Sequence, residues 1–221
     1  MGNFILIDER IGWNVAKKTK AEALETRSAI LDAAEEVFER DGVSKASLEE
    51  IASSAGVSRG AVYWYFKNKT DLLDAVIRRV CDILDSGVAE VEARQPANAL
   101  DGLRIRALQV LSQIANNSQC QRVLKIAWHQ CEYVGDMARV RDTHLGRGNL
   151  FISIHEDAIR DCCRQGLLPE SLCSRRAAVS LMGLVYGLAA TWMLDPESFP
   201  LDEYGAWAID NYLCGLQHAK V

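Results

Sequence analysis

The sequence predicts an all-α protein of about nine helices, in which a small N-terminal helix-turn-helix head joins a larger helical body. Two observations predict this fold class. Apolar residues recur at helical spacing along most of the 221-residue chain, whereas alternating strand patterns are almost absent. Capping and helix-breaking residues divide this pattern into segments of ordinary helix length. The composition, with 49% apolar and 25% charged residues, is that of a globular protein that buries a core.

Three helices are expected in the head. An apolar stripe marks the first, which ends at Asp41-Gly42. A Ser-x-x-Glu capping box at 47–50 opens the second, which runs through Ala55. The third begins at Ser58, where a serine can cap the helix. The apolar residues that identify the first and third helices are Ile30, Leu31, Ala34, Val37, Phe38, Val62 and Phe66.

Six further helices are expected in the body. A long amphipathic helix begins near Lys69 and ends before Pro96. Gly146 and Gly148 are expected to kink or split one of the later helices, because glycine is unfavourable inside a helix. The later helices are expected at about 98–116, 118–130, 136–165, 174–194 and 202–217.

These elements suggest three parts of the chain. Residues 1–21 form an N-terminal extension and basic arm, residues 22–68 the helix-turn-helix domain, and residues 69–221 the remaining helical domain. The arm has two interpretations, a segment that reaches a neighbouring DNA groove or a solvated tail. Its cations are Lys17, Lys18 and Lys20.

Charge and cysteine content narrow the function classes. A net charge of −5 argues weakly against a protein coated in nucleic acid, but it is compatible with a local basic patch. The seven cysteines show no CxxC pair or other metal-type spacing, so we expect reduced, mostly buried thiols and neither a metal nor a cofactor. Asp8, Glu9 and Arg10 lie where the apolar core of a signal peptide would run, which favours a cytoplasmic protein.

An uncharged stretch at 177–194 raises the question of a membrane span. Its length is near the minimum for a transmembrane helix, and Gly183 and Gly187 form a GxxxG pair. The small and polar residues Ala, Ser, Gly and Thr dilute its hydrophobicity, and no second such stretch exists. We therefore expect a helix buried in a core or in a dimer interface, with no membrane contact.

The segment 47–69 carries the strongest functional signal. Two short helices separated by Gly56 have the spacing of a helix-turn-helix, whose second helix can enter the major groove of DNA. Between Val57 and Lys69 there are three cations and no acid, which suits phosphate contacts. Gly60 lies in the first turn of the second helix, where a missing side chain permits close approach to DNA.

Four consecutive aromatic residues occupy 63–66 in this segment. Successive helical residues point about 100° apart, so a single core-facing stripe cannot bury all four. The alternative interpretation, a core cluster with Gly60 easing helix packing, accounts for Phe66 and Val62 but not for the whole run. Tyrosine hydroxyls and an indole N–H are suitable phosphate donors.

Residues 17–80, and above all GVSRGAVYWYFKNK at 56–69, resemble the DNA-binding head of TetR-family transcriptional repressors. The resemblance is closest to the AcrR and TtgR branch, which controls multidrug efflux pumps, and it continues more weakly through the body. It implies a homodimer that represses transcription at a palindromic double-stranded operator. The residues that it places at DNA are Ser47, Ser58, Arg59, Gly60, Ala61, Tyr63, Trp64, Tyr65, Lys67 and Lys69.

The resemblance also implies that a hydrophobic small-molecule inducer binds inside the body and releases the operator. The expected walls of this site are Leu103, Val110, Leu124, Trp128, Phe151, His155, Met182, Val185 and Tyr186. Trp128, His155 and Tyr186 are the strongest candidates, because each combines an apolar body with a polar group. The expected dimer interface, formed by the last two helices, includes Gly183, Gly187, Trp192, Trp207 and Tyr212.

Two function classes other than a transcriptional repressor are an enzyme and a protein-binding adaptor. An enzyme is disfavoured, because the sequence lacks HExxH, G-x-S-x-G, Walker and G-x-G-x-x-G motifs. A helical protein-binding adaptor without DNA contact is the remaining alternative. Relatives in this branch often begin with a short basic segment followed by Thr-Lys, so we expect translation to start at Val15 and residues 1–14 not to belong to the native chain.

Overall fold

A computed structural model describes residues 19–93, 95–133 and 135–219 of the chain. Within these ranges it contains nine α-helices, one short 3-10 helix and no strand, which confirms the all-α prediction. The helices are α1 (Lys20–Asp41), α2 (Leu48–Ser54), α3 (Arg59–Tyr65), α4 (Lys69–Glu92), α5 (Ala99–Asn116), α6 (Ser118–His129), the 3-10 helix η1 (Gly135–Met137), α7 (Ala138–Arg164), α8 (Ser174–Leu194) and α9 (Leu201–Gln217).

Local capping explains why the head helices begin where they do. Thr19 and Glu22 form a capping box at the start of α1, so Lys20 belongs to this helix and not to an extended arm. Ser47 and Ser58 cap α2 and α3, each with its hydroxyl oxygen accepting a backbone N–H three residues ahead. Gly56 supplies the positive φ of the turn between α2 and α3. Lys17 and Lys18 lie outside the described residues.

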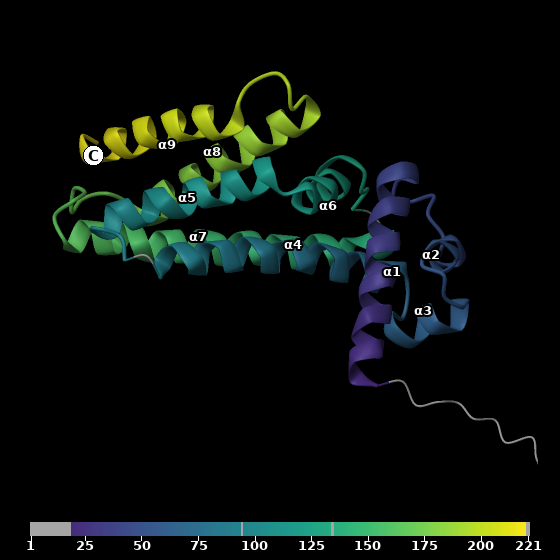
Figure 1. Cartoon of the computed structure of the whole chain (residues 1–221). Helices are drawn as coiled ribbons and strands as arrows, with labels where there is room; N and C mark the ends of the chain where they lie inside the picture. The colour runs from purple at the N-terminus through teal and green to yellow at the C-terminus, as the bar shows by residue number, and fades with distance from the viewer. Residues whose placement is uncertain (1–18, 94, 134, 220–221) are drawn as a thin grey trace, which may run out of the picture.

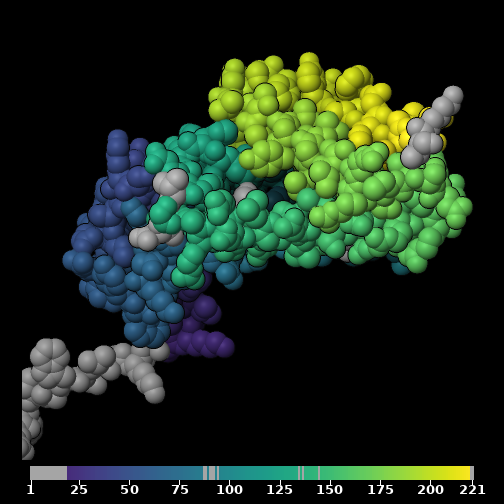
Figure 2. Space-filling model, turned by 180° about the vertical axis from the view of Figure 1, so that it is seen from behind, coloured from purple at the N-terminus to yellow at the C-terminus, as the bar shows by residue number. Residues whose placement is uncertain are grey.

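The head packs at one end of an elongated helical body (Figure 1). Helix α1 lies across the end of α4 and contacts α2, α4 and α6. In the body, α5 lies at the centre and contacts α4, α7, α8 and α9. Helices α8 and α9 lie together on the outer side of the body, away from α4 (Figure 1). Seen from behind, the surface is hollowed where the segments of α6 and α7 approach α8 (Figure 2).

Helix α7 differs from its sequence-based expectation. It runs without a break from Ala138 to Arg164, so Gly146 and Gly148 neither end nor split it. The cost of mid-helix glycine is about 1 kcal/mol each, and the burial of apolar residues such as Ile152 and Ile159 along the same helix offsets it.

Glycine is instead required at Gly205, where α9 packs against α5. A Cβ there would stand 2.4 Å from Cδ1 of the buried Leu111. Nothing near Gly205 in the sequence indicates this neighbour.

Helix α8 contains the uncharged stretch at 177–194. Among the described residues it is the one helix that is long and apolar enough to cross a membrane by length and composition. The core helix of a soluble protein passes the same test, so this property alone is weak evidence for a membrane span. Residues spaced along α8 are buried against the body, including Ala178, Leu181, Val185 and Ala189.

Candidate DNA-binding surface and ligand-binding interior

Helix α3 divides its aromatic residues between the core and the surface. Val62 and Phe66 are buried and attach the helix to the head. Tyr63 and Trp64 are 44% and 73% exposed, and Tyr65 is half-buried with its ring 4.5 Å from that of Trp64. The exposed rings are therefore not needed for the core of the head, as the helical spacing predicts.

Arg59 and Gly60 form the exposed N-terminal tip of α3. A Cβ added at Gly60 would meet only Oγ of Ser58, at an ordinary distance of 3.9 Å. The packing of the head therefore does not require glycine here, which removes the interpretation that Gly60 serves close helix packing. The neighbouring Ala61 is partly exposed, and both it and Ser58 belong to the same tip.

Arg59 is held in place by two neighbours. Its Nη1 lies 2.6 Å from Oε1 of Glu49 on α2, and its Nη2 lies 3.4 Å from the hydroxyl of Tyr63. The guanidinium also lies over the Tyr63 ring, 5.4 Å from the ring centre. The hydrogen bond to Tyr63 and the charge of Glu49 raise the pKa of Arg59, so this group stays charged.

Lys69 has a structural role that the sequence did not indicate. Its Nζ donates hydrogen bonds to the backbone carbonyls of Ser44 and Ala46, at 2.9 and 3.0 Å, and so connects the start of α4 to the loop before α2. Partial burial lowers its pKa. One N–H of the ammonium is left for a phosphate, whereas Lys67 is exposed.

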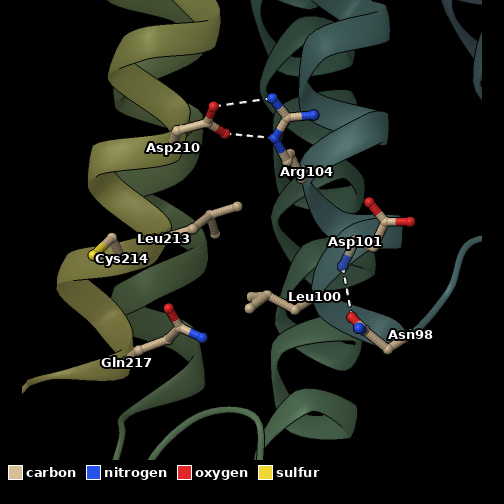
Figure 3. A pocket seen from close by; sticks show the side chains of 8 residues that line it. All are labelled: Asn98, Leu100, Asp101, Arg104, Asp210, Leu213, Cys214 and Gln217. Atoms are coloured by element: carbon tan, nitrogen blue, oxygen red, sulfur yellow. Dashed lines mark hydrogen bonds and ion pairs between the residues drawn. The ribbon is translucent and has the colours of Figure 1, made fainter.

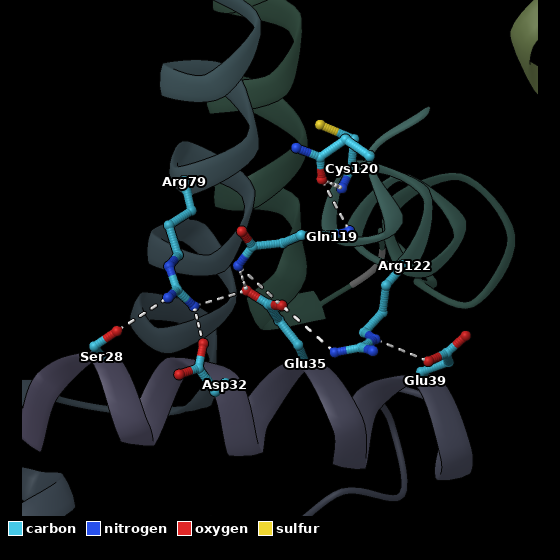
Figure 4. Close-up of polar contacts among 9 residues, drawn as sticks. Ser28, Asp32, Glu35, Glu39, Arg79, Gln119, Cys120 and Arg122 are labelled. Atoms are coloured by element: carbon cyan, nitrogen blue, oxygen red, sulfur yellow. Dashed lines mark hydrogen bonds and ion pairs between the residues drawn. The ribbon is translucent and has the colours of Figure 1, made fainter. Parts of the chain in front are cut away.

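A buried carboxylate, Glu35, connects the head to the body. It is 1% exposed on α1, and its Oε1 accepts hydrogen bonds from Arg79 on α4 and Gln119 on α6, at 2.9 and 3.0 Å (Figure 4). Arg122 on α6 lies 4.0 Å from its other oxygen. Burial raises the pKa of Glu35, and its hydrogen bonds and the charge of Arg79 oppose that shift.

Further polar contacts join α6 to α1 beside Glu35. Glu39 pairs with Arg122 at 3.2 Å and Lys125 at 3.5 Å, and Gln130 donates from Nε2 to the carbonyl of Glu39 at 3.0 Å. Glu35 lies inside the apolar stripe of α1, and a glutamate in such a stripe is a signal for a paired buried charge. Its partners on α4 and α6 are not indicated by the sequence. The contacts join α6 of the body to α1 of the head.

Two of the buried polar atoms that have no hydrogen-bond partner among the described residues belong to predicted wall residues of the ligand site. They are Nε2 of His155 on α7 and Nε1 of Trp128 on α6, and both are buried. Nδ1 of His155 contacts the carbonyl of Phe151 at 2.8 Å, and the two rings stack at 3.9 Å. Buried polar atoms usually have partners, so these two are suited to a ligand that can hydrogen-bond.

The predicted wall residues belong to four helices, α5, α6, α7 and α8. Trp128 packs against Tyr186, with ring centres 4.6 Å apart, and Tyr186 is partly exposed on α8. Both lie on helices that border the hollow in Figure 2. The apolar members Leu103, Val110, Leu124 and Val185 are buried in the core, whereas Phe151 and Met182 are half-buried.

A separate surface pocket of about 270 Å³ lies between α5 and α9 (Figure 3). Arg104 and Asp210 form a two-pronged ion pair across it, with Nη2 to Oδ2 at 2.9 Å. The pocket is lined by Asn98, Leu100, Asp101, Arg104, Asp210, Leu213, Cys214 and Gln217, none of which belongs to the predicted ligand site. Two of its charged groups, Arg104 and Asp210, pair with each other.

The last two helices present an exposed apolar face. Trp207 is 71% exposed, and Gly183 and Gly187 have open space where a Cβ would stand. Trp192 is only 8% exposed in the single chain and packs in the core, so its place in the dimer interface stays a prediction. Tyr212 donates its hydroxyl to the carbonyl of Ala177 at 2.6 Å and mainly joins α9 to α8. The apolar residues exposed on α8 and α9 are Val179, Tyr186, Leu194, Tyr204 and Trp207.

The cysteines form no disulfide in the described part of the chain, and no group of three His, Cys, Asp or Glu there is placed to hold a metal ion. Burial raises the pKa of Cys120 and Cys162 to about 11, so these thiols are unreactive near neutral pH.

The helix-turn-helix head and the all-helical body are typical of a DNA-binding transcriptional regulator. Residues 30–76 match the family model for bacterial regulatory proteins of the tetR family, and residues 98–218 match the C-terminal region of MAATS-type transcriptional repressors. The chain belongs to the TetR family and is a repressor of this type. Members of the family are soluble DNA-binding regulators, not enzymes.

Individual relatives support the same branch. The HTH-type transcriptional regulator AcrR of Shigella flexneri is 37% identical over 210 residues, which cover 90% of this chain and 94% of AcrR. The structure of NalD, the secondary repressor of the MexAB-OprM multidrug efflux pump in Pseudomonas aeruginosa, has a TM-score of 0.76 at 30% identity and covers 91% of this chain and 100% of NalD. A complex of SmeT with triclosan has a TM-score of 0.77 at 28% identity, covering 86% of this chain and 91% of SmeT.

Proposed function

We propose that this repressor binds a palindromic operator as a homodimer in the cytoplasm and that it controls a multidrug efflux pump. The observation that carries the proposal is the tip of α3, where exposed Arg59 and Gly60 stand beside the exposed rings of Tyr63 and Trp64. Such a tip fits the major groove of DNA. Arg59 would contact a base edge, and the aromatic groups, Ser47 and Lys67 would contact phosphates. The relationship to AcrR and NalD supports the link to efflux.

Replacing Arg59 tests the proposed base contact. Arg59→Ala should lose discrimination at one or two base pairs by about 1–3 kcal/mol, because an arginine contacts guanine through two hydrogen bonds. Titration of the DNA upstream of the protein's own gene, with single-base variants of the protected site, measures this. Equal weakening on all sequences would show that Arg59 contacts only phosphate.

We further propose that a hydrophobic small molecule with a hydrogen-bonding group binds between α6, α7 and α8. The buried, unpartnered atoms of His155 and Trp128 supply the polar contacts, and the surrounding apolar residues supply the walls. SmeT, a relative of the same fold, has been solved with triclosan. A ligand there would move α6, which contacts α1 through Glu35 and Glu39.

Induction is tested by adding triclosan and other apolar phenols to the protein–operator complex. We expect release from DNA and a rise in the Tm of the free protein, because the ligand binds only the folded chain. His155→Phe should weaken both effects, while Cys214→Ala, in the separate surface pocket, should leave them unchanged. Release from His155→Phe at the same ligand concentration as from the parent would place the inducer elsewhere.

A further inference from the structure

The folded head places one acid directly against the cation at the tip of α3. The sequence from Val57 to Lys69 contains no acid, but Glu49 on α2 brings its Oε1 within 2.6 Å of Nη1 of Arg59. Both side chains are more than half exposed. The neighbouring acid Glu50 points elsewhere and pairs with Arg40 on α1.

Folding stability explains an acid in the first turn of α2, where a negative charge suits the helix N-terminus, but it does not explain the pairing of this acid with Arg59. An exposed ion pair contributes little to stability, because water screens it and two long side chains must be ordered. A carboxylate on the surface that meets DNA also repels phosphates and so lowers affinity for every sequence. The pairing of its carboxylate with Arg59 therefore needs a reason connected with recognition.

Glu49 and Tyr63 together fix the guanidinium of Arg59. Glu49 contacts Nη1, whereas Tyr63 contacts Nη2 with its hydroxyl and lies under the guanidinium with its ring. An arginine without these contacts can turn toward any phosphate along the backbone. An arginine held by these contacts is already ordered before the protein binds DNA, so it loses less conformational freedom on contacting a base edge. The acid also competes with DNA phosphates for the N–H groups of the arginine.

We infer that Glu49 is a positioning residue that makes Arg59 sequence-selective, by ordering its side chain and by keeping it from phosphates. The inference rests on the proposed base contact of Arg59. It predicts that the acid lowers binding to non-specific DNA more than binding to the operator.

The test compares Glu49→Gln with Glu50→Gln, which removes the same charge one residue away. Affinity for the operator and for a scrambled duplex is measured across a range of salt concentrations. In Glu49→Gln we expect the ratio of specific to non-specific affinity to fall about two- to five-fold, the range of one exposed ion pair. The salt dependence on scrambled DNA should steepen by about 0.9, the value for one added phosphate contact.

Glu50→Gln should raise both affinities together and leave their ratio and the salt slope close to those of the parent. In the double variant Glu49→Gln/Arg59→Ala the steeper slope should vanish, because the freed arginine is absent. Equal ratios and slopes in Glu49→Gln and Glu50→Gln would overturn the inference, as would a slope change that persists without Arg59.

The same series separates this inference from the proposed function. If Arg59→Ala loses base discrimination while the two glutamine variants behave alike, only the role of Glu49 is wrong. If Arg59→Ala keeps its base discrimination, the base contact is wrong and the role of Glu49 fails with it.

Discussion

Gly60 occupies the first turn of α3 with space for a methyl group beside it. Gly60→Ala should therefore leave the fold intact and raise the free energy of unfolding by up to about 1 kcal/mol, because alanine favours a helix. It should also weaken operator binding, because a Cβ would stand between the backbone and the DNA. Denaturant unfolding and operator titration of the same preparation measure the two effects. Operator affinity equal to that of the parent would remove Gly60 from the interface.

His155 makes stability depend on pH. Burial lowers its pKa to about 4, whereas the pKa of an unfolded histidine is about 6.5. Between pH 6.5 and pH 4 the unfolded chain therefore binds more protons than the folded chain. The free energy of unfolding falls as the pH drops through this range and changes little below it. Between pH 7 and pH 5 we expect His155 to lower the free energy of unfolding by about 2 kcal/mol.

His155→Phe isolates that contribution, because the other titrating groups remain. Urea unfolding at pH 7 and 5 should show a smaller loss in the variant than in the parent by about the same 2 kcal/mol. Equal losses in the two proteins would mean that His155 is accessible to protons in the folded state.

At the scale of elements, the contact between α1 and α6 depends on a buried charge. Glu35→Ala removes a carboxylate that Arg79 and Gln119 contact, and it leaves Arg79 without its buried partner. We expect the free energy of unfolding to fall by about 1–3 kcal/mol, because Gln119 loses its partner while Arg79 keeps its ion pair with Asp32 at 2.6 Å. Glu39→Ala, on the same helix but more exposed, should cost less than about 1 kcal/mol.

Denaturant unfolding of the two variants at pH 7 measures this difference. Similar losses in both would show that Glu35 is solvated in the folded protein and that the junction is held by the exposed pairs.

Short-range signals explain which elements were predictable. Capping residues such as Ser47 and Ser58 act within a few residues of their helix, so the sequence indicates α2 and α3 within one or two positions. The exposed and buried sides of α3 follow from helical spacing alone. The individual DNA contacts stay predictions, because they depend on a partner outside this chain. The division of the chain at 21 and 68 also stays a prediction.

Contacts between distant segments explain what the sequence could not indicate. The carbonyls that hold Lys69 lie more than 20 residues earlier, and the partners of Glu35 lie more than 40 and 80 residues later. The burial of Trp192 and the continuity of α7 likewise follow from packing of whole helices. Residue type and spacing carry no information on these neighbours.

For the molecule as a whole, the exposed face of α8 and α9 predicts a homodimer. Trp207→Ala should weaken the dimer at least about ten-fold, because large exposed aromatic residues are frequent anchors of interfaces. Leu145→Ala, which changes an exposed apolar residue on α7, should leave it unchanged. Sedimentation at micromolar protein measures both, and a parent chain that is monomeric there would contradict the predicted interface.

The central claim is that two heads of one dimer read a palindromic operator through α3. The most direct measurement is a footprint on the DNA upstream of the protein's own gene, at two salt concentrations. We predict protection of two half-sites whose centres lie about 34–36 Å apart, or a multiple of this, with weaker protection at higher salt. Uniform coating of the DNA, or no protection at either salt concentration, would contradict the claim.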